Sequence, residues 1–246
     1  MTLILSDMKM AEVIHQNHLL IPIINRFSIR LGFGEKTVKT VCRDVQTDPE
    51  FFITILNTFS NENYFPEKKL FTFNVLMLLK YLRKTHNYYL DSQIPLIERH
   101  INALIQASPS NPHLELVRKF FINYKKELII HISREEAVTF PYIEKIHHFI
   151  HESFDQTEYN HLMETTKNYS IKKFDEDHDN IDDKLYDLQN ILIKYVTGEF
   201  DELLINTVIF EVYRLEKDIK DHTRLEDKIL IPMVAEMENI LNAKSV

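Results

Sequence analysis

The sequence reads His131-Ile-Ser-Arg-Glu135-Glu136-Ala-Val-Thr-Phe-Pro141 in its middle and His222-Thr-Arg-Leu-Glu226-Asp227-Lys-Ile-Leu-Ile-Pro232 near its end. Each stretch has a histidine, a glutamate four residues later, a second acid directly after it, and a proline six residues after the glutamate. Because four residues make about one helical turn, each His and its Glu project side by side from one helix face. A neutral imidazole beside a carboxylate suits a first-row transition metal such as iron, zinc or manganese.

A further histidine precedes each stretch at nearly the same distance. His86 lies 45 residues before His131, and His178 lies 44 residues before His222. The unit of a histidine, a long gap and His-x3-Glu therefore occurs twice. A third His-x3-Glu match, at residues 148–152, lacks the second acid, the proline and the upstream histidine, so we expect it on a solvated surface.

Four long segments carry apolar residues at steps of three and four, and each candidate ligand lies in such a stripe. The segments are residues 70–107, 113–150, 171–196 and 201–242. Short turns join the first to the second and the third to the fourth, which makes each pair antiparallel neighbours. In both pairs the two histidines lie 20 to 24 residues from the turn between them, and so at a common height along the helices. The sequence predicts an all-α protein whose main domain is an antiparallel four-helix bundle.

The organisation of the chain follows from this bundle. Residues 1–58 are predicted to form a small helical N-terminal domain, with one helix over Met8–Phe27 and a glycine-containing turn after it. Residues 59–69 are a predicted linker, and residues 70–246 are the bundle. A stretch at about 146–169 has its own apolar spacing and is interpreted as an inserted helix or lid. At Pro141 and Pro232 we expect a kink or an early helix end.

Composition excludes several classes of protein. Three glycines and eight prolines provide few turns for a sheet protein. The single cysteine, Cys42, excludes an internal disulfide and a cysteine-based metal site, and suits a reducing compartment. A formal charge of −8 without a basic block argues against nucleic acid as a partner. Because neither a signal peptide nor an apolar stretch of about 20 residues is evident, we expect a cytoplasmic protein without a membrane partner.

The candidate ligands have to be compared with ordinary core residues. A single histidine on an apolar helix face is more often a hydrogen-bonded core residue than a metal ligand. Six such residues at one level are different, because each buried ionised carboxylate would cost several kcal/mol if it had no counter-charge. We therefore predict a metal site formed by His86, His131, Glu135, His178, His222 and Glu226.

The pattern also distinguishes two kinds of dinuclear bundle. Ferritin-like sites use Glu-x2-His on two helices and a glutamate from each of the others, and this chain has no such motif in register. Four histidines and two glutamates would hold two irons, with both glutamates bridging, and would leave positions for an oxo bridge and a small ligand.

These residues resemble the hemerythrin-like family, and more closely its di-iron proteins for repair of iron centres, also described as regulators of cell morphogenesis and nitric oxide signalling. The resemblance covers nearly the whole chain, and all six candidate ligands match a ligand position. The N-terminal part is similar to the small helical domain of the same proteins, in which a turn carries a Cys-Cys pair. In this chain the matching stretch, Phe27-Ser-Ile-Arg-Leu-Gly-Phe-Gly34, has no cysteine.

The resemblance implies a role in repairing iron–sulfur centres damaged by nitric oxide or oxidants, by iron donation or by binding or reducing nitric oxide. Iron–sulfur proteins would then be clients, and enzymatic activity is left open. The alternative is a hemerythrin-like protein that reversibly binds O2 or NO as a carrier or sensor. Oxygen carriers have a fifth histidine, and none is found in register after His178, where Asp182 occupies the next turn.

Overall fold

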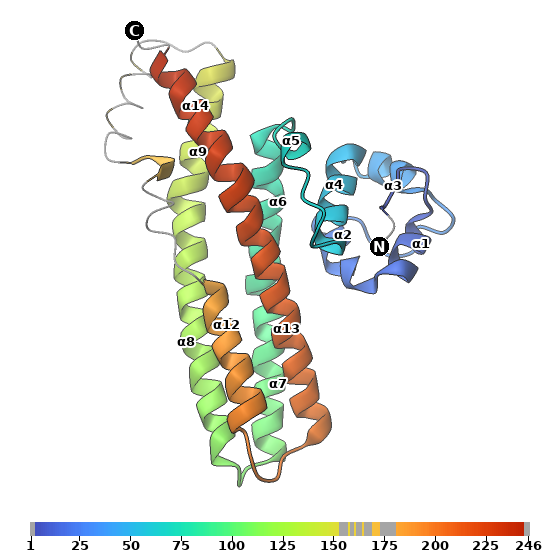
Figure 1. Ribbon diagram of the computed structural model, residues 1–246, viewed down its shortest axis with the longest axis vertical. Helices are drawn as coiled ribbons and strands as arrows, with labels where there is room; N and C mark the ends of the chain where they lie inside the picture. Colours follow the sequence, from blue (N-terminus) through green and yellow to red (C-terminus); the bar gives the residue numbers. More distant parts are fainter. Residues whose placement is uncertain are drawn as a thin grey trace. The chain divides into compact units, whose positions relative to one another are not determined.

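The computed structural model describes residues 3–152, 157, 160, 164, 169–172 and 181–243. Regular structure in these ranges is helical, and the β-pairing found there is one isolated bridge between Lys9 and Thr37. The all-α prediction is confirmed (Figure 1). No helix within the described ranges is long and apolar enough to cross a membrane.

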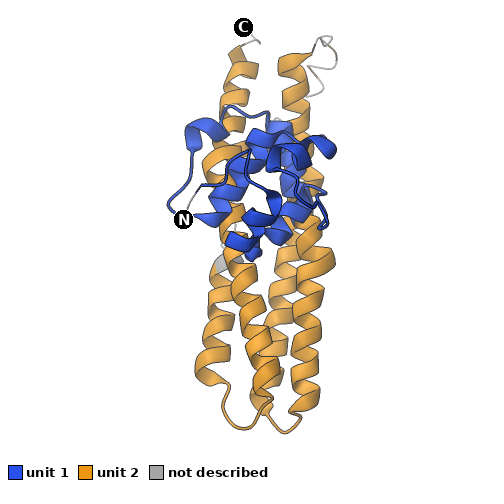
Figure 2. Cartoon of the chain, turned by 90° about the vertical axis from the view of Figure 1, so that its right-hand side faces the viewer, with its two compact units in different colours: residues 1–85 blue, residues 86–246 orange. Residues whose placement is uncertain are grey.

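The chain divides into two compact units, residues 1–85 and residues 86–246 (Figure 2). The division falls inside helix α6, Val75–Tyr88, and so lies later than the predicted start of the bundle at residue 70. The first part of α6 packs with the N-terminal unit through Tyr81. Its ring stacks on Phe27 with centroids 5.2 Å apart and meets Phe51 and Phe59 edge-on.

The N-terminal unit is built from short helices. They are α1 Met10–Gln16, a 3-10 turn His18–Leu20, α2 Ile21–Arg26, α3 Val38–Asp44, α4 Pro49–Ser60 and α5 Glu67–Leu70. The single helix expected over Met8–Phe27 is wrong. Asn17 is extended, with φ of −153°, and its side chain accepts from the backbone N–H of Leu19, which ends α1 and caps the next turn.

Each bundle helix is a long rod built from consecutive segments. The first continues from α6 through a π-turn, Tyr89–Gln93, into α7, Ile94–Ala107. The second is α8 Pro112–Arg134, a π-turn Glu135–Thr139 and α9 Phe140–His151. The third is described as α12 Ile181–Asn190 with a π-turn Ile191–Tyr195. The fourth is α13 Glu202–Leu225, a π-turn Glu226–Leu230 and α14 Ile231–Ala243.

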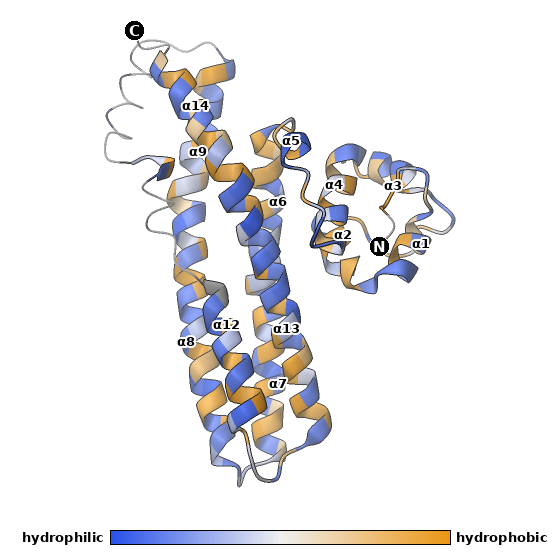
Figure 3. Ribbon diagram, viewed as in Figure 1, coloured by the Kyte–Doolittle hydropathy of each residue, from blue (hydrophilic) through white to orange (hydrophobic). Residues whose placement is uncertain are grey.

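The half of the bundle that contains α7 and α12 holds one continuous apolar core. Helix α7 packs against α8 and α13, and α12 packs against the same two helices. Apolar and polar residues alternate along each helix with helical spacing (Figure 3). Buried core residues come from all four helices, among them Ile97, Ile101, Val117, Phe121, Leu185, Leu188, Val208 and Val212.

The two short turns hold the helix pairs together at one end of the bundle (Figure 1). Asn111 Nδ2 donates to the carbonyls of Thr197 and Glu199, at 2.9 and 3.1 Å. The backbone N–H of Asp201 donates to Ser108 Oγ at 2.9 Å. These bonds connect the turn of one antiparallel helix pair to the turn of the other. They fix how far the two pairs are shifted against each other along the bundle axis.

The prolines do not end their helices. Pro95, Pro141 and Pro232 each lie two residues after the last residue of a π-turn. In the second and fourth helices the N–H groups of Phe140 and Ile231 donate to the carbonyls of Glu135 and Glu226, five residues back. A proline lacks the N–H and its ring clashes with the carbonyl four residues before it, so one widened turn accommodates it and the helix continues.

The first residues of the predicted insertion belong to a bundle helix. Residues Ile146–His151 are the last turns of α9, where Ile146 and Phe149 are buried. Most of the rest of the 146–169 segment lies outside the described residues. Tyr169 is described, and its hydroxyl lies 2.8 Å from Thr139 Oγ1.

Cys42 is fully buried on α3 and is a packing residue. Burial, and secondarily the charge of Asp48, raises the pKa of its thiol to about 12. The thiolate is the reactive form, so it stays scarce until the pH approaches that value.

In the folded protein we expect Cys42 to react with an aromatic disulfide reagent at least about 100-fold more slowly than in the urea-unfolded chain at mildly alkaline pH. The measurement is the release of the coloured thiol with time. A folded-state rate equal to the unfolded rate would contradict the burial of this side chain.

Candidate metal centre

Two helical His-x3-Glu pairs and one histidine from the first helix meet in the bundle interior. His131 is in the last turn of α8 and His222 in the last turn of α13, and their partners Glu135 and Glu226 are the first residues of the following π-turns. One ligand atom from each of His86, Glu135, His222 and Glu226 lies within 4.8 Å of the others. All four side chains are buried, with 0 to 4% of their surface exposed.

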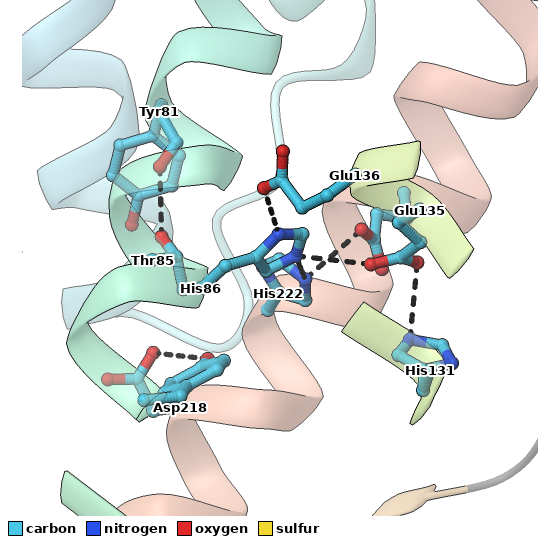
Figure 4. A network of polar contacts seen from close by, with 10 residues as sticks. Tyr81, Thr85, His86, His131, Glu135, Glu136, Asp218 and His222 are labelled. Atoms are coloured by element: carbon cyan, nitrogen blue, oxygen red, sulfur yellow. Dashed lines mark hydrogen bonds and ion pairs between the residues drawn. The ribbon is translucent and has the colours of Figure 1, made fainter. Parts of the chain in front are cut away.

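The donor atoms face one another at close range (Figure 4). Glu135 lies between two imidazoles: its Oε2 is 3.1 Å from His86 Nε2, and its Oε1 is 3.2 Å from His131 Nε2. On the opposite helix Glu226 Oε1 is 3.1 Å from His222 Nε2. The Nε2 atoms of His86 and His222 are 3.3 Å apart.

This donor set fits a cation. Two carboxylates in the bundle interior need a positive counter-charge, and two imidazole nitrogens that face each other need either a proton or a metal between them. Burial by itself lowers the pKa of His86, but hydrogen bonds to Glu135 and Glu136 outweigh it and raise that pKa to about 9. In the protein without metal, a proton on His86 therefore supplies part of the charge that a cation would supply.

The sequence did not show how Glu136 is used. In the sequence, Glu136 is recognisable only as the second acid of the motif. In the structure, its Oε1 accepts a hydrogen bond from His86 Nδ1 at 2.7 Å. The equivalent acid of the other copy, Asp227, is exposed. A carboxylate behind a ligating histidine fixes the imidazole tautomer and orientation. Glu136 therefore positions His86, a role that its place in the sequence motif does not reveal.

Aromatic residues complete the surroundings of the histidines. The ring of Phe140 stacks on His86, with centroids 5.4 Å apart and planes within 7°. The ring of Tyr89 meets His222 edge-on at 5.7 Å, and its hydroxyl donates to Asp218 Oδ1 at 2.9 Å. Phe140, Tyr89 and Asp218 were not predicted as site residues, because a single apolar or polar position has no motif around it.

A cavity of about 10 Å³ lies beside the cluster, between His131 and His222. Tyr89, Thr223 and aliphatic side chains of α8 and α13 line the rest of it. Its volume corresponds to about one water molecule. Among the predicted ligands that the structure describes, His131 is the most exposed, with 15% of its side chain accessible.

The remaining histidine predictions have different outcomes. His178 lies outside the described residues. His148 pairs with Glu152 at 3.1 Å with 48% and 66% of their side chains exposed, which confirms a solvated surface for the third His-x3-Glu match. His147 and His151 stack on each other at 4.2 Å on α9.

Comparison with known proteins supplies the family. A sequence model described as the hemerythrin HHE cation binding domain matches residues 79–234, which is more than half of the chain and includes all six predicted ligands. No curated protein matches the chain. With its all-α bundle and its buried His/Glu cluster at the positions expected of a cation site, this chain belongs to the hemerythrin family.

Proposed function

We propose that this protein is a non-haem di-iron protein whose ligands are His86, His131, Glu135, His178, His222 and Glu226, with Glu135 and Glu226 as bridging carboxylates. The observation that carries the proposal is the buried cluster of four donor atoms within 4.8 Å. The position of Glu135 supports bridging, because its two oxygens face two different imidazoles, His86 and His131.

When bound, an iron pair would supply a change of oxidation state and open positions for a small ligand. The chain's own residues would limit what can reach it. The cavity between His131 and His222 has room for about one water-sized molecule, which suits a diatomic ligand such as NO or O2. The rings of Phe140 and Tyr89 cover His86 and His222 and keep bulk water from them.

We further propose that the protein repairs iron–sulfur centres damaged by nitric oxide or oxidants, with iron–sulfur proteins as its clients. The resemblance of both units to the di-iron repair proteins supports this role. The partial exposure of His131 gives iron one side from which it could be exchanged. The N-terminal turn has no cysteine and Cys42 is buried, so a thiol-dependent handover has no reactive group there.

A reversible carrier or sensor of O2 or NO is the second candidate, and the small cavity suits this function equally well. The first experiment measures the metal content and the absorption spectrum of protein purified without added metal. It tests the di-iron site that both functions require. About two irons per chain with oxo-bridge bands in the near ultraviolet would support the di-iron proposal. Zinc alone, or no metal that ferrous iron restores, would refute it.

Iron transfer then distinguishes the roles. For a repair protein we expect iron to leave the loaded protein and, with sulfide supplied in the assay, to rebuild the cluster of an apo iron–sulfur protein. Recovery of the cluster's absorption measures this transfer. Tight retention of iron together with reversible O2 binding would exclude repair and favour the carrier or sensor.

Replacing Glu136 with Gln should weaken metal binding by about 10- to 100-fold, which is the usual effect of losing the partner behind a ligating histidine. The carboxylate that accepts from His86 Nδ1 would be lost, while an amide of the same shape remains. Competition with a chelator of known affinity measures the change.

The matched control is Glu236→Gln, which removes the same charge from an exposed position on α14. It should leave metal affinity unchanged. Equal affinities for the Glu136 variant and the control would show that Glu136 does not position His86.

A further inference from the structure

Two histidines outside the bundle interior lie one above the other in the last turns of α9. His147 and His151 are four residues apart, and their rings stack with centroids 4.2 Å apart and an interplanar angle of 22°. Residues four apart share one helix face, and two histidines at this spacing on a helix bind zinc in metalloproteases. Neither belongs to the six ligands proposed above. They lie at the end of the bundle away from the two short turns (Figure 1).

The helix itself fixes the tautomer of His151. The Nδ1 atom of this ring lies 3.0 Å from the backbone carbonyl oxygen of His147. Because a carbonyl oxygen can only accept, Nδ1 carries the hydrogen and donates it. In the neutral ring the lone pair is then on Nε2 of an exposed side chain, where a cation can bind it. Metal-ligating histidines are oriented in the same way, by donating their other N–H to a carbonyl or a carboxylate.

His147 favours the neutral form that binds metal. Its side chain is half-buried, and burial lowers the pKa of the ring, to which the neighbouring His151 adds. In the part of the chain that the structure describes, its ring nitrogens make no hydrogen bond or ion pair. The neutral imidazole therefore offers a nitrogen lone pair beside that of His151.

The spacing of the two rings is close to what one cation needs. Two metal–nitrogen bonds of about 2.0–2.1 Å at a tetrahedral angle place their nitrogens about 3.3 Å apart. Rings with centroids 4.2 Å apart reach this separation by small rotations of the side chains. The backbone does not have to move, because both residues lie within α9, Phe140–His151.

Negative charge surrounds the pair. The carboxyl end of a helix carries a partial negative charge, and α9 ends at His151. The carboxylate of Glu152 follows directly. It pairs with His148 Nδ1 at 3.1 Å, and its charge also acts on the ring of His147. A cation held by the two imidazoles would therefore be stabilised by its surroundings.

We propose that His147 and His151 form a surface site for a divalent transition-metal cation such as Zn²⁺, with water in the remaining coordination positions. Imidazole nitrogens suit zinc, copper and nickel, whereas Mg²⁺ and Ca²⁺ prefer oxygen ligands. The site is separate from the buried His/Glu cluster and does not depend on which metal that cluster binds.

The test is a titration of the full-length, iron-loaded protein with Zn²⁺, followed by calorimetry. We expect the unmodified protein to bind one more Zn²⁺ per chain than the His147→Gln, His151→Gln double variant. Because the buried cluster is the same in both proteins, their difference isolates the surface site. Loss of both ligands should weaken binding at this site by more than about 100-fold, beyond the effect of losing an outer partner. Mg²⁺ in ~100-fold excess should not compete. Equal zinc binding by the two proteins, or displacement by Mg²⁺, would refute the proposal.

A matched double variant controls for non-specific binding by exposed histidines. His15→Gln with His18→Gln removes two exposed imidazoles that do not share a helix, because the extended Asn17 separates them. It should leave zinc binding unchanged, and an equal loss of zinc in this control would refute the site.

Amide hydrogen exchange tests the location. A cation bound by both rings links one turn of α9 to the next, so Zn²⁺ should slow exchange in the last turn of α9. This slowing should be present in the unmodified protein and in the control, and absent from the His147→Gln, His151→Gln variant. Zinc binding without protection of that turn would overturn the assignment.

Discussion

Replacing Glu135 and Glu226 together with glutamine is expected to abolish metal retention, and either single change should lose at least one of the two irons that we propose. Each glutamate is buried and places an oxygen 3.1 to 3.2 Å from an imidazole nitrogen. A neutral amide cannot bridge two cations. The loss of metal affinity should therefore exceed the effect, about 10- to 100-fold, of removing the partner behind a ligating histidine. Metal content by mass spectrometry on proteins purified without added metal measures it.

When both proteins are free of metal, we expect the same double variant to be more stable than the unmodified protein. Removing two buried carboxylates removes their desolvation cost, so the free energy of unfolding without metal should rise by about 1–4 kcal/mol. A variant that had simply misfolded would instead unfold more easily. Glu236→Gln is the matched control and should change neither quantity, because Glu236 is exposed. Two irons retained by Glu135→Gln would contradict the bridging assignment of that residue.

Removing the metal from the unmodified protein should lower the stability of the bundle by about 4 kcal/mol, the linkage effect of a cation present at about 1,000 times its dissociation constant. For a unit of this size that corresponds to a melting temperature lower by roughly 8–16 °C. The physical reason is that the buried carboxylates of Glu135 and Glu226 then lose the positive charge of the bound cation. Calorimetry before and after chelation measures the shift.

The controls for this experiment come from the chain itself. Adding ferrous iron back should restore the melting temperature. In the Glu135→Gln, Glu226→Gln double variant, the chelator should have no effect. The thiol of Cys42, in the N-terminal unit, should stay as unreactive after chelation as before, because that unit contains none of the ligands. An unchanged melting temperature after complete removal of metal would show that the His/Glu cluster does not couple metal binding to folding.

Local spacing was enough to predict that several of the candidate ligands lie close together. A His and a Glu four residues apart must share a helix face, whatever the rest of the fold does. The equal distances of the histidines from the two short turns then predicted that His86 would meet the His-x3-Glu pairs, and the structure brings His86, Glu135, His222 and Glu226 together. The all-α bundle could be predicted for the same reason, since periodicity, a shortage of glycine and short turns are properties of the chain itself.

What followed a proline could not be predicted from the sequence. Pro141 and Pro232 were expected to kink or end their helices, but a π-turn precedes each of them and the helix continues. Sequence identifies the missing N–H, whereas packing decides whether the helix ends or widens by one residue. In the intact bundle α9 and α14 pack against each other beyond these prolines, and their burial favours continuation.

The sequence by itself therefore determined the bundle helices, their antiparallel order and the His-x3-Glu pairs that share a helix face, because these depend on spacing along one chain segment. The tertiary structure decided that Glu136 accepts from His86, and that the rings of Phe140 and Tyr89 lie against His86 and His222. Those groups are separated by many residues, and which of them meet depends on how the helices pack, a quantity that no local pattern specifies.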